Sequence, residues 1–392
     1  MTTLIYLGIV ALLFLGITEK IYRKYWDQGL DADVRFSEKE VEEGQQLAVK
    51  VVVENRKMLP LPTLMVKFEM DRNLLCVDGS KTSVTDKQYR NEFITIMPNE
   101  RVTRKIDITA TKRGFYSIDE WSFVTTDILF KALFTKNEKN YTWLYVYPSR
   151  SKYVADSEIF CQMNGECLAN RMLWEDSMEF KGIRDYTQTD PMHKVNWKAT
   201  ARTGELKVNQ YYDSTSQRFT IFLNVDQSEI LKYYDLIEES IRITRNFIES
   251  FVIKGIPVRV ISNGVDKLTK KEIYIREGAG LSHIDECLKQ LAKMDIHSPK
   301  RNMTELIREE ISKGESAAQY SEISLLISAE QTMELAEAYQ EYAGQLSNAN
   351  WLVPIHASTK RYYDENVEEA RKRGVGEHSI RTEFLVIEEL EG

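Results

Sequence analysis

Hydrophobic and polar residues alternate with a period of two between residues 31 and 150. The clearest runs are 47–53, 66–70 and 106–108, where every second residue is apolar. Clusters of Asn, Asp, Gly and Pro separate these runs, which is typical of short strands joined by turns. The pattern predicts an antiparallel β-sandwich over residues 31–150, with one face of each strand in the core.

The period changes after residue 218. Short continuous apolar runs at 219–225, 257–262, 323–327 and 351–355 alternate with segments that have helical spacing, at 230–253, 281–294 and 331–346. Strands without alternation are typical of parallel sheets that helices cover on both faces. Residues 218–392 are therefore predicted to form an α/β domain with a parallel sheet.

The N-terminus carries an apolar run from Thr2 to Thr18, with no charged residue before Glu19. A bilayer span needs about 20 residues and at least about 17. The aromatic residues of segment 21–26 would extend this short run into the headgroup region. A cleaved signal peptide is the alternative, but the basic N-terminal region and the small-residue cleavage site that it requires are absent. The pattern favours an uncleaved transmembrane anchor over residues 1–26.

The charges that flank this run predict its orientation. Lys20, Arg23 and Lys24 all follow the run. The positive-inside rule then predicts a single-pass protein of the cell membrane, with the soluble body facing the cytoplasm.

Composition narrows the class of partner. The formal net charge of −8 at pH 7 argues against broad nucleic-acid binding, which needs a basic face. The cysteines are sparse and show no Cys-x-x-Cys spacing, which favours free thiols in a reducing compartment: they are Cys76, Cys161, Cys167 and Cys287.

Segment 180–212 concentrates large, directional side chains in a short span. It resembles the central motif of the bacterial family called domain of unknown function 58. The matching residues are Phe180, Gly182, Arg184, Tyr186, Asp190, Trp197, Lys198, Ala201 and Arg202. Thr189 departs from the pattern, because the family usually has Gly before the Asp.

This resemblance implies an immunoglobulin-like sandwich at 31–150, the motif within 151–217, and a von Willebrand factor A-like domain at 218–392. Members of the family are commonly encoded beside MoxR-type AAA+ ATPases and transglutaminase-like membrane proteins. The resemblance therefore implies a non-catalytic adaptor that works with such an ATPase in assembling or remodelling protein or envelope complexes.

The motif has two interpretations. Arg184 and Asp190 could form a bidentate pair, while Tyr186 and Trp197 offer flat surfaces for packing. Residues 195–201 are predicted to form a short helix that Gly204 ends. A structural clamp against the α/β domain is favoured over a partner surface, because such pairs are common structural devices. Residues predicted for either role are Arg184, Tyr186, Asp190, His193, Trp197, Lys198 and Arg202.

A degenerate metal site is predicted after the first strand of the α/β part. Asp226 and Ser228 match two positions of the Asp-x-Ser-x-Ser motif of von Willebrand factor A domains, but Ile230 replaces the last Ser. Magnesium tolerates an incomplete octahedron poorly, so no metal is expected. Asp226 and Ser228 are instead predicted to cap a helix that starts near Glu229.

Signatures of an enzyme are missing. There is no Walker loop and no Gly-x-Ser-x-Gly, and the histidines have no metal-ligand spacing. They are His193, His283, His297, His356 and His378. No catalytic residue or cofactor is predicted. Two alternatives remain: a metal-dependent hydrolase with its site near Asp226 and His193, and an extracellular adhesion module.

Overall fold

The protein is described from a computed structural model. The described residues are 2–77, 83–84, 87–127, 130, 132–165, 180–187, 192, 195–211, 217–227, 233–298, 300–313, 321–344, 348–358 and 380–388. The chain divides into two compact units, which are treated separately below. The first unit comprises residues 1–149 and 291–293, and the second comprises residues 150–290 and 294–392.

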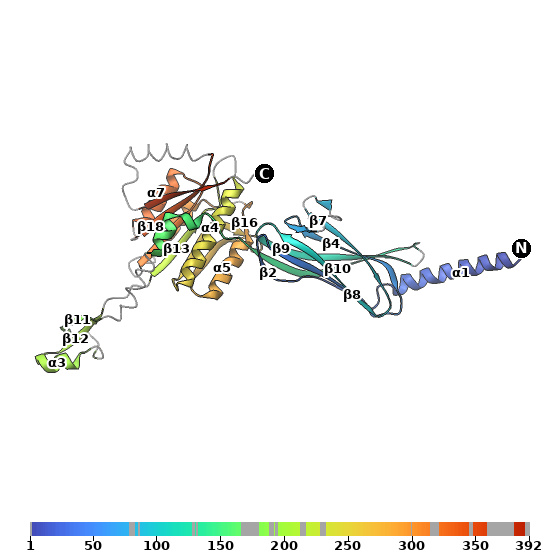
Figure 1. The fold of residues 1–392 in the computed structure, drawn as a ribbon, viewed down its shortest axis with the longest axis horizontal. Helices are drawn as coiled ribbons and strands as arrows, with labels where there is room; N and C mark the ends of the chain where they lie inside the picture. Colours follow the sequence, from blue (N-terminus) through green and yellow to red (C-terminus); the bar gives the residue numbers. More distant parts are fainter. Residues whose placement is uncertain are drawn as a thin grey trace. The chain divides into compact units, whose positions relative to one another are not determined.

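The first unit begins with helix α1 (Thr2–Tyr25), which two β-sheets follow (Figure 1). One sheet has the order β1-β3-β8-β5, with strands β1 (Leu30–Phe36), β3 (Gln46–Asn55), β8 (Glu100–Ala110) and β5 (Leu74–Cys76). The other has the order β2-β10-β9-β4-β7-β6, with strands β2 (Glu40–Glu42), β10 (Leu133–Tyr147), β9 (Gly114–Thr126), β4 (Leu61–Asp71), β7 (Lys87–Ile96) and β6 (Ser83–Val84). Among the described strand pairs of this unit, β2–β10 is parallel and the others are antiparallel.

The core of this unit follows from the period-two pattern. In β3, Val49, Val51 and Val53 are fully buried, whereas Lys50 lies on the opposite face and stays partly exposed. Residues of both sheets join one hydrophobic cluster, so the two sheets pack face to face.

Two aromatic residues at the end of α1 belong to this same core. Tyr22 is 1% exposed, and its hydroxyl donates a hydrogen bond to the Pro60 carbonyl at 2.7 Å. Trp26 stacks on Phe134 with ring centroids 5.8 Å apart. These rings therefore cover the end of the sandwich.

The predicted transmembrane anchor is wrong. Tyr22 and Trp26 are buried among the strands and do not extend the apolar run of α1 into a headgroup region. Within the described residues, no helix has both the length and the apolar character needed to cross a membrane. The predicted single-pass location in the cell membrane is corrected with it.

The second unit contains a seven-stranded sheet with the order β15-β14-β13-β17-β18-β19, and β16 pairs with β14. Its strands are β13 (Gln217–Leu223), β14 (Val258–Asp266), β15 (Glu272–Gly278), β16 (Met294–Asp295), β17 (Ser321–Ile327), β18 (Asn348–His356) and β19 (Ile380–Ile387). Its longer helices are α4 (Tyr234–Ile253), α5 (Leu281–Lys293), α6 (Met303–Lys313) and α7 (Met333–Ala343).

This sheet is mixed, whereas a parallel sheet was predicted. The pairs from β14 through β13, β17 and β18 to β19 are parallel, but β15 and β16 both run antiparallel to β14. The β14–β15 hairpin was not predicted, because apolar and polar residues alternate in β15 and the other strands of this unit were predicted from continuous apolar runs. Ile273 and Ile275 are buried, while Tyr274 between them is half exposed, as in an edge strand with one solvated face.

The predicted fold class is therefore wrong as a whole. It combined a transmembrane helix, an immunoglobulin-like sandwich and a von Willebrand factor A-like domain with a parallel sheet. The described part of the chain has no membrane-spanning helix, its second large sheet is mixed, and most of its elements are strands.

A buried ionic network links three strands of the seven-stranded sheet to the helices of the second unit. Glu322 accepts hydrogen bonds from Arg218 at 2.7 Å and from Arg259 at 3.0 Å. Thr220 and Tyr342 donate to the same carboxylate at 2.5 and 2.8 Å. Burial opposes the ionisation of Glu322, but the Arg259 charge and the donors outweigh it, and the pKa of Glu322 is lowered.

Lys57 gives the first unit a testable pH dependence. Its Nζ atom is buried and has no hydrogen-bond partner among the described residues, and burial lowers its pKa from 10.5 to about 8. Between these two values the unfolded chain binds more protons than the folded one, so stability should rise with pH across this window. Lys57→Met should be more stable than the parent at pH 7 and should lose this rise.

Urea unfolding at a series of pH values from 7 to 10.5 measures both effects, using the ordinary lysine pKa as the upper limit. Lys105→Met removes the same charge from an exposed site, and should keep the parental profile. A Lys57→Met profile parallel to that of the parent would contradict the prediction.

Candidate functional site

The sequence motif forms a two-stranded sheet with a short helix, here called the motif hairpin: β11 (Phe180–Asp185), α3 (Trp197–Thr203) and β12 (Lys207–Tyr211) (Figure 1). β11 and β12 are antiparallel, with Ile183 opposite Asn209. Val195 forms a bridge with Val208, so the chain before α3 also pairs with β12.

Local hydrogen bonds explain why α3 forms. The Asn196 side chain accepts from the Ala199 N–H at 3.0 Å, which caps the N-terminus. Asn196 is itself held by Asn209, to which it donates at 2.7 Å. Gly204 follows the helix with a φ of 74°, and its N–H donates to the Thr200 carbonyl. This confirms Gly204 as the residue that ends the helix.

The motif hairpin has little core of its own. No residue of α3 is buried, and Trp197 is 63% exposed. Among the described residues of the motif hairpin and its bridge, the buried apolar side chains are Val195 and Val208. Trp197 therefore does not pack into a core of the motif hairpin itself, and the predicted clamp against the α/β part stays a prediction.

The described contacts of the remaining motif residues are local ones. Arg184 donates to the Asp185 carbonyl at 3.0 Å. Tyr186 is half-buried, and its N–H donates to the Leu206 carbonyl at 3.0 Å. Asp190 and His193 lie outside the described residues, so the predicted Arg184–Asp190 pair is not tested.

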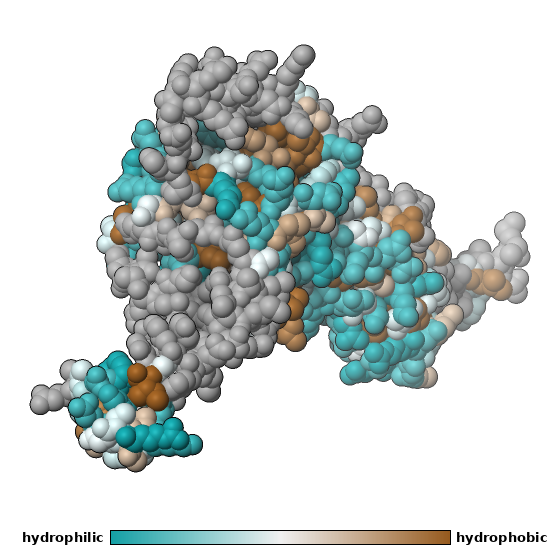
Figure 2. Space-filling model, turned by 60° about the vertical axis from the view of Figure 1, so that its left-hand side comes forward, coloured by the Kyte–Doolittle hydropathy of each residue, from teal (hydrophilic) through white to brown (hydrophobic). Residues whose placement is uncertain are grey.

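A hollow of about 580 Å³ lies on the motif hairpin. It is called the basic groove, and it is lined by Ile183, Arg184, Asp185, Asn196, Lys198, Ala199, Arg202, Thr203 and Lys207. Among the described residues, its lining contains four cationic side chains and one carboxylate. Figure 2 shows hydrophobic residues beside hydrophilic ones on the surface of this part of the chain.

The cations of the basic groove differ in their partners. Lys207 forms an ion pair with Asp185 and lies 3.7 Å from a Glu205 oxygen. The hydrogen bond to Asp185 raises the pKa of Lys207. Lys198 and Arg202, by contrast, have no ion-pair partner among the described residues, although they lie one helical turn apart on α3.

A polar cluster lies at the carboxyl ends of the parallel strands in the seven-stranded sheet. It lies between β13 and β17, where the order of the strands in the sheet reverses relative to their order in the sequence. Asn224 donates to the Ser328 hydroxyl and to a Glu330 oxygen, both at 3.0 Å. Asn263 donates to the Asn224 side chain at 2.8 Å, and accepts from the Val225 N–H. Sequence reasoning missed Asn224 and Asn263, although a polar residue that ends an apolar run was a usable signal.

The predicted capping role of Asp226 is not tested, because the predicted helix start near Glu229 lies outside the described residues. Helix α4 begins at Tyr234, and Gln227 accepts the Tyr233 N–H at 2.6 Å. The Asp226 N–H donates to the Asn224 side chain at 3.0 Å. Ser228 and Ile230 lie outside the described residues, and those that are described contain no group of three or more His, Cys, Asp or Glu side chains that could hold a metal.

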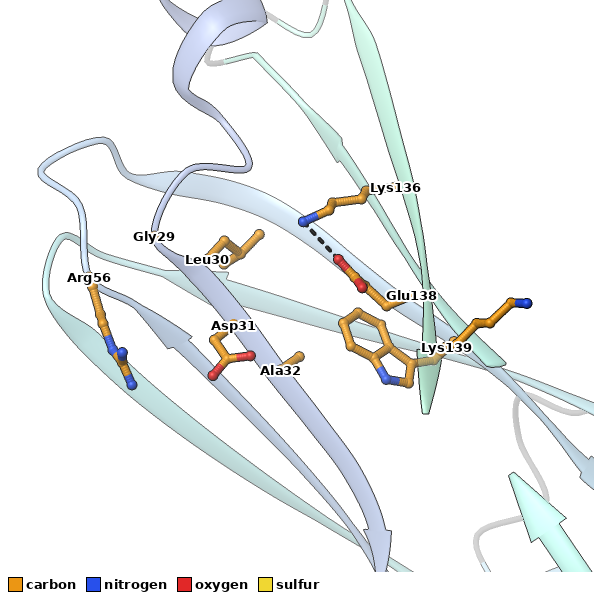
Figure 3. A pocket seen from close by; sticks show the side chains of 9 residues that line it. Gly29, Leu30, Asp31, Ala32, Arg56, Lys136, Glu138 and Lys139 are labelled. Carbon is orange, nitrogen blue, oxygen red and sulfur yellow. Dashed lines mark ion pairs between the residues drawn. The ribbon is translucent and has the colours of Figure 1, made fainter. Parts of the chain in front are cut away.

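A second hollow, of about 410 Å³, lies on the sandwich of the first unit (Figure 3). Lys136 and Glu138 form an ion pair at 2.7 Å there, while Lys139 extends away from the other labelled side chains. Asp31 and Arg56 also line this hollow. Carboxylates and cations are nearly balanced in it, so no class of charged ligand is selected.

A buried Cys–His pair is also present in the second unit. The Cys287 sulfur lies 3.5 Å from Nε2 of His283, and the same nitrogen lies 2.9 Å from the Val258 carbonyl oxygen. Burial, with a smaller effect of the Glu286 charge, raises the pKa of the Cys287 thiol to about 12. A thiol with this pKa is almost entirely protonated near neutral pH and is a poor nucleophile.

Comparison with known proteins assigns no family. No family model and no curated protein matches the chain, so the resemblance to domain of unknown function 58 stays a prediction. Among solved structures, the CARDB domain of the Pyrococcus furiosus protein PF1109 is 17% identical, covers 30% of this chain and 93% of its own, and has a TM-score of 0.20.

Two further structures are similar at the same level. A non-cellulosomal cohesin from Archaeoglobus fulgidus is 14% identical and covers 29% of this chain and 91% of its own, with a TM-score of 0.20. AvmM, which catalyses macrocyclization in alchivemycin A biosynthesis, is 10% identical, covers 31% and 92%, and has a TM-score of 0.22. Likenesses this weak support no conclusion about the function of this chain.

Proposed function

We propose that this protein is a non-catalytic adaptor that uses the motif hairpin to bind a partner protein. The observation that carries the proposal is the exposure of Trp197 beside the basic groove. Tryptophan and arginine are the residues that most often dominate the energy of a protein interface. A large exposed aromatic ring next to several cations has no structural role that the described contacts supply, whereas it suits a docking surface.

The partner proposed is a MoxR-type AAA+ ATPase, and the process is the assembly or remodelling of protein or envelope complexes. Both rest on the resemblance of segment 180–212 to the family motif. The same resemblance suggests a transglutaminase-like membrane protein as a further partner of the complex.

The absence of a catalytic role is part of the proposal. It is supported by the character of the Cys287–His283 pair, because the thiol is buried and its pKa is raised. The alternative of a metal-dependent hydrolase near Asp226 and His193 gains no support from the described residues, which contain no group of three or more His, Cys, Asp or Glu side chains that could hold a metal.

Trp197→Ala tests the docking surface. The ring is 63% exposed, so the variant should melt at the parental temperature. Its binding to the purified ATPase should fall by about tenfold or more, as expected for the loss of an aromatic anchor worth about 2 kcal/mol. Thermal unfolding and a pull-down with the ATPase give the two readouts.

Leu268→Ala is a suitable control, because it truncates another exposed apolar side chain of the second unit outside the motif. It should bind like the parent. Parental binding of Trp197→Ala would contradict the role of the motif hairpin, and a large loss of its melting temperature would support the clamp.

A further inference from the structure

We infer that the basic groove binds an acidic peptide segment of the partner, one that also carries an apolar side chain. This inference rests on the proposed function and adds the chemistry of the segment that is recognised.

Charge is the first argument. The chain as a whole has a net charge of −8, yet the described lining of the basic groove holds Arg184, Lys198, Arg202 and Lys207 against one carboxylate, that of Asp185. A concentrated charge of one sign attracts ligands of the other and raises their rate of association. The local field therefore favours a negatively charged ligand.

The placement of Lys198 and Arg202 is the second argument. Like charges four residues apart on a helix destabilise it by about 0.2–0.5 kcal/mol. The short α3 places these cations at this spacing, and neither has an ion-pair partner in the described part of the chain. Carboxylates supplied from outside would relieve the repulsion, and Arg202 can bind one of them through two parallel hydrogen bonds.

Part of the groove rim is already organised. Asp185 is neutralised by its ion pair with Lys207, and Asn196 is held by hydrogen bonds to Ala199 and Asn209. A rim that is fixed before binding loses little conformational entropy when a ligand arrives. Lys198 and Arg202 are the cations left to meet the ligand.

Exposed apolar side chains argue for a peptide rather than for a nucleic acid. Ile183 lies in the groove lining and is 46% exposed, and the exposed Trp197 precedes Lys198 on α3. Double-stranded nucleic acid needs an extended basic face, whereas this chain has a net charge of −8. A peptide that combines carboxylates with an apolar residue complements both features of the surface.

The charge-reversed variant Lys198→Glu/Arg202→Glu tests the inference in the full chain. The probes are the purified ATPase and a short fluorescein-labelled peptide of alternating glutamate and leucine. The parent should bind both, more weakly as salt is raised, and the variant should lose about tenfold or more in affinity for each. Lys271→Glu makes one such reversal at an exposed site of the same unit outside the groove, and should bind like the parent.

The outcomes separate this inference from the proposed function. If Trp197→Ala loses the ATPase but the charge-reversed variant keeps it, the adaptor role holds and the acidic segment is rejected. If the parent binds the peptide but not the ATPase, the groove chemistry holds and the proposed partner fails. A neutral variant, Lys198→Gln/Arg202→Gln, checks that any loss does not come from misfolding, since it should melt like the parent and still bind both probes more weakly. Equal binding of a lysine–leucine peptide or of a DNA duplex, or self-association of the parent, would overturn the inference.

Discussion

Replacing Glu322 by alanine should destabilise the second unit by about 3–5 kcal/mol, which is the usual cost of removing one partner from a buried ion pair. Glu322 is 3% exposed, and its carboxylate accepts hydrogen bonds from both Arg218 and Arg259. Its removal leaves two guanidinium groups on neighbouring strands without their shared counter-charge. Chemical denaturation that follows the second unit measures the loss.

Two variants make this result specific. Glu322→Gln keeps the size of the side chain and some hydrogen bonds but removes the charge, so it should lie between the parent and Glu322→Ala. Glu309 is an exposed glutamate in ion pairs with Arg301 and Lys313, and Glu309→Ala should melt like the parent. If Glu322→Ala also melted like the parent, the network would have no net structural role.

Trp26→Ala should destabilise the first unit by about 3–5 kcal/mol, as expected for the truncation of a buried aromatic side chain. Its ring stacks on Phe134 and is 7% exposed within the sandwich core. The variant tests directly whether the end of α1 belongs to the sandwich. Denaturation of the full chain, followed by a probe of the first unit, is the measurement.

Trp197→Ala is the matched control for this variant, because it removes the same side chain from a site that is 63% exposed. The two substitutions should affect different properties of the protein. Trp26→Ala should lose stability, and Trp197→Ala should lose binding alone. An unchanged unfolding midpoint for Trp26→Ala would show that the end of α1 is not part of the core.

The sequence alone was sufficient to predict those elements whose spacing of apolar and polar residues indicates a strand or a helix. The alternation at Val49, Val51 and Val53 places these residues on one face of β3, because side chains of a strand point to opposite faces in turn. The largely apolar run at Phe219–Leu223 predicts β13 for the same kind of reason, since a strand that is covered on both faces carries apolar side chains on both of them. Gly204 could be assigned as the end of α3 because a left-handed residue there favours glycine.

Only the tertiary structure decided which surface each segment meets. Tyr22 and Trp26 have the composition of membrane-interface residues, yet they are buried among strands that begin many residues later. The Glu322 network joins residues more than 100 positions apart, such as Arg218 and Glu322, and no spacing in the sequence announces it. Trp197 was predicted to be buried because large aromatic residues usually pack, whereas the small motif hairpin offers its ring no core. Amino-acid sequence by itself determined the periodic elements of this protein; burial, ionic partners and the exposed binding surface depended on which distant segments came together in space.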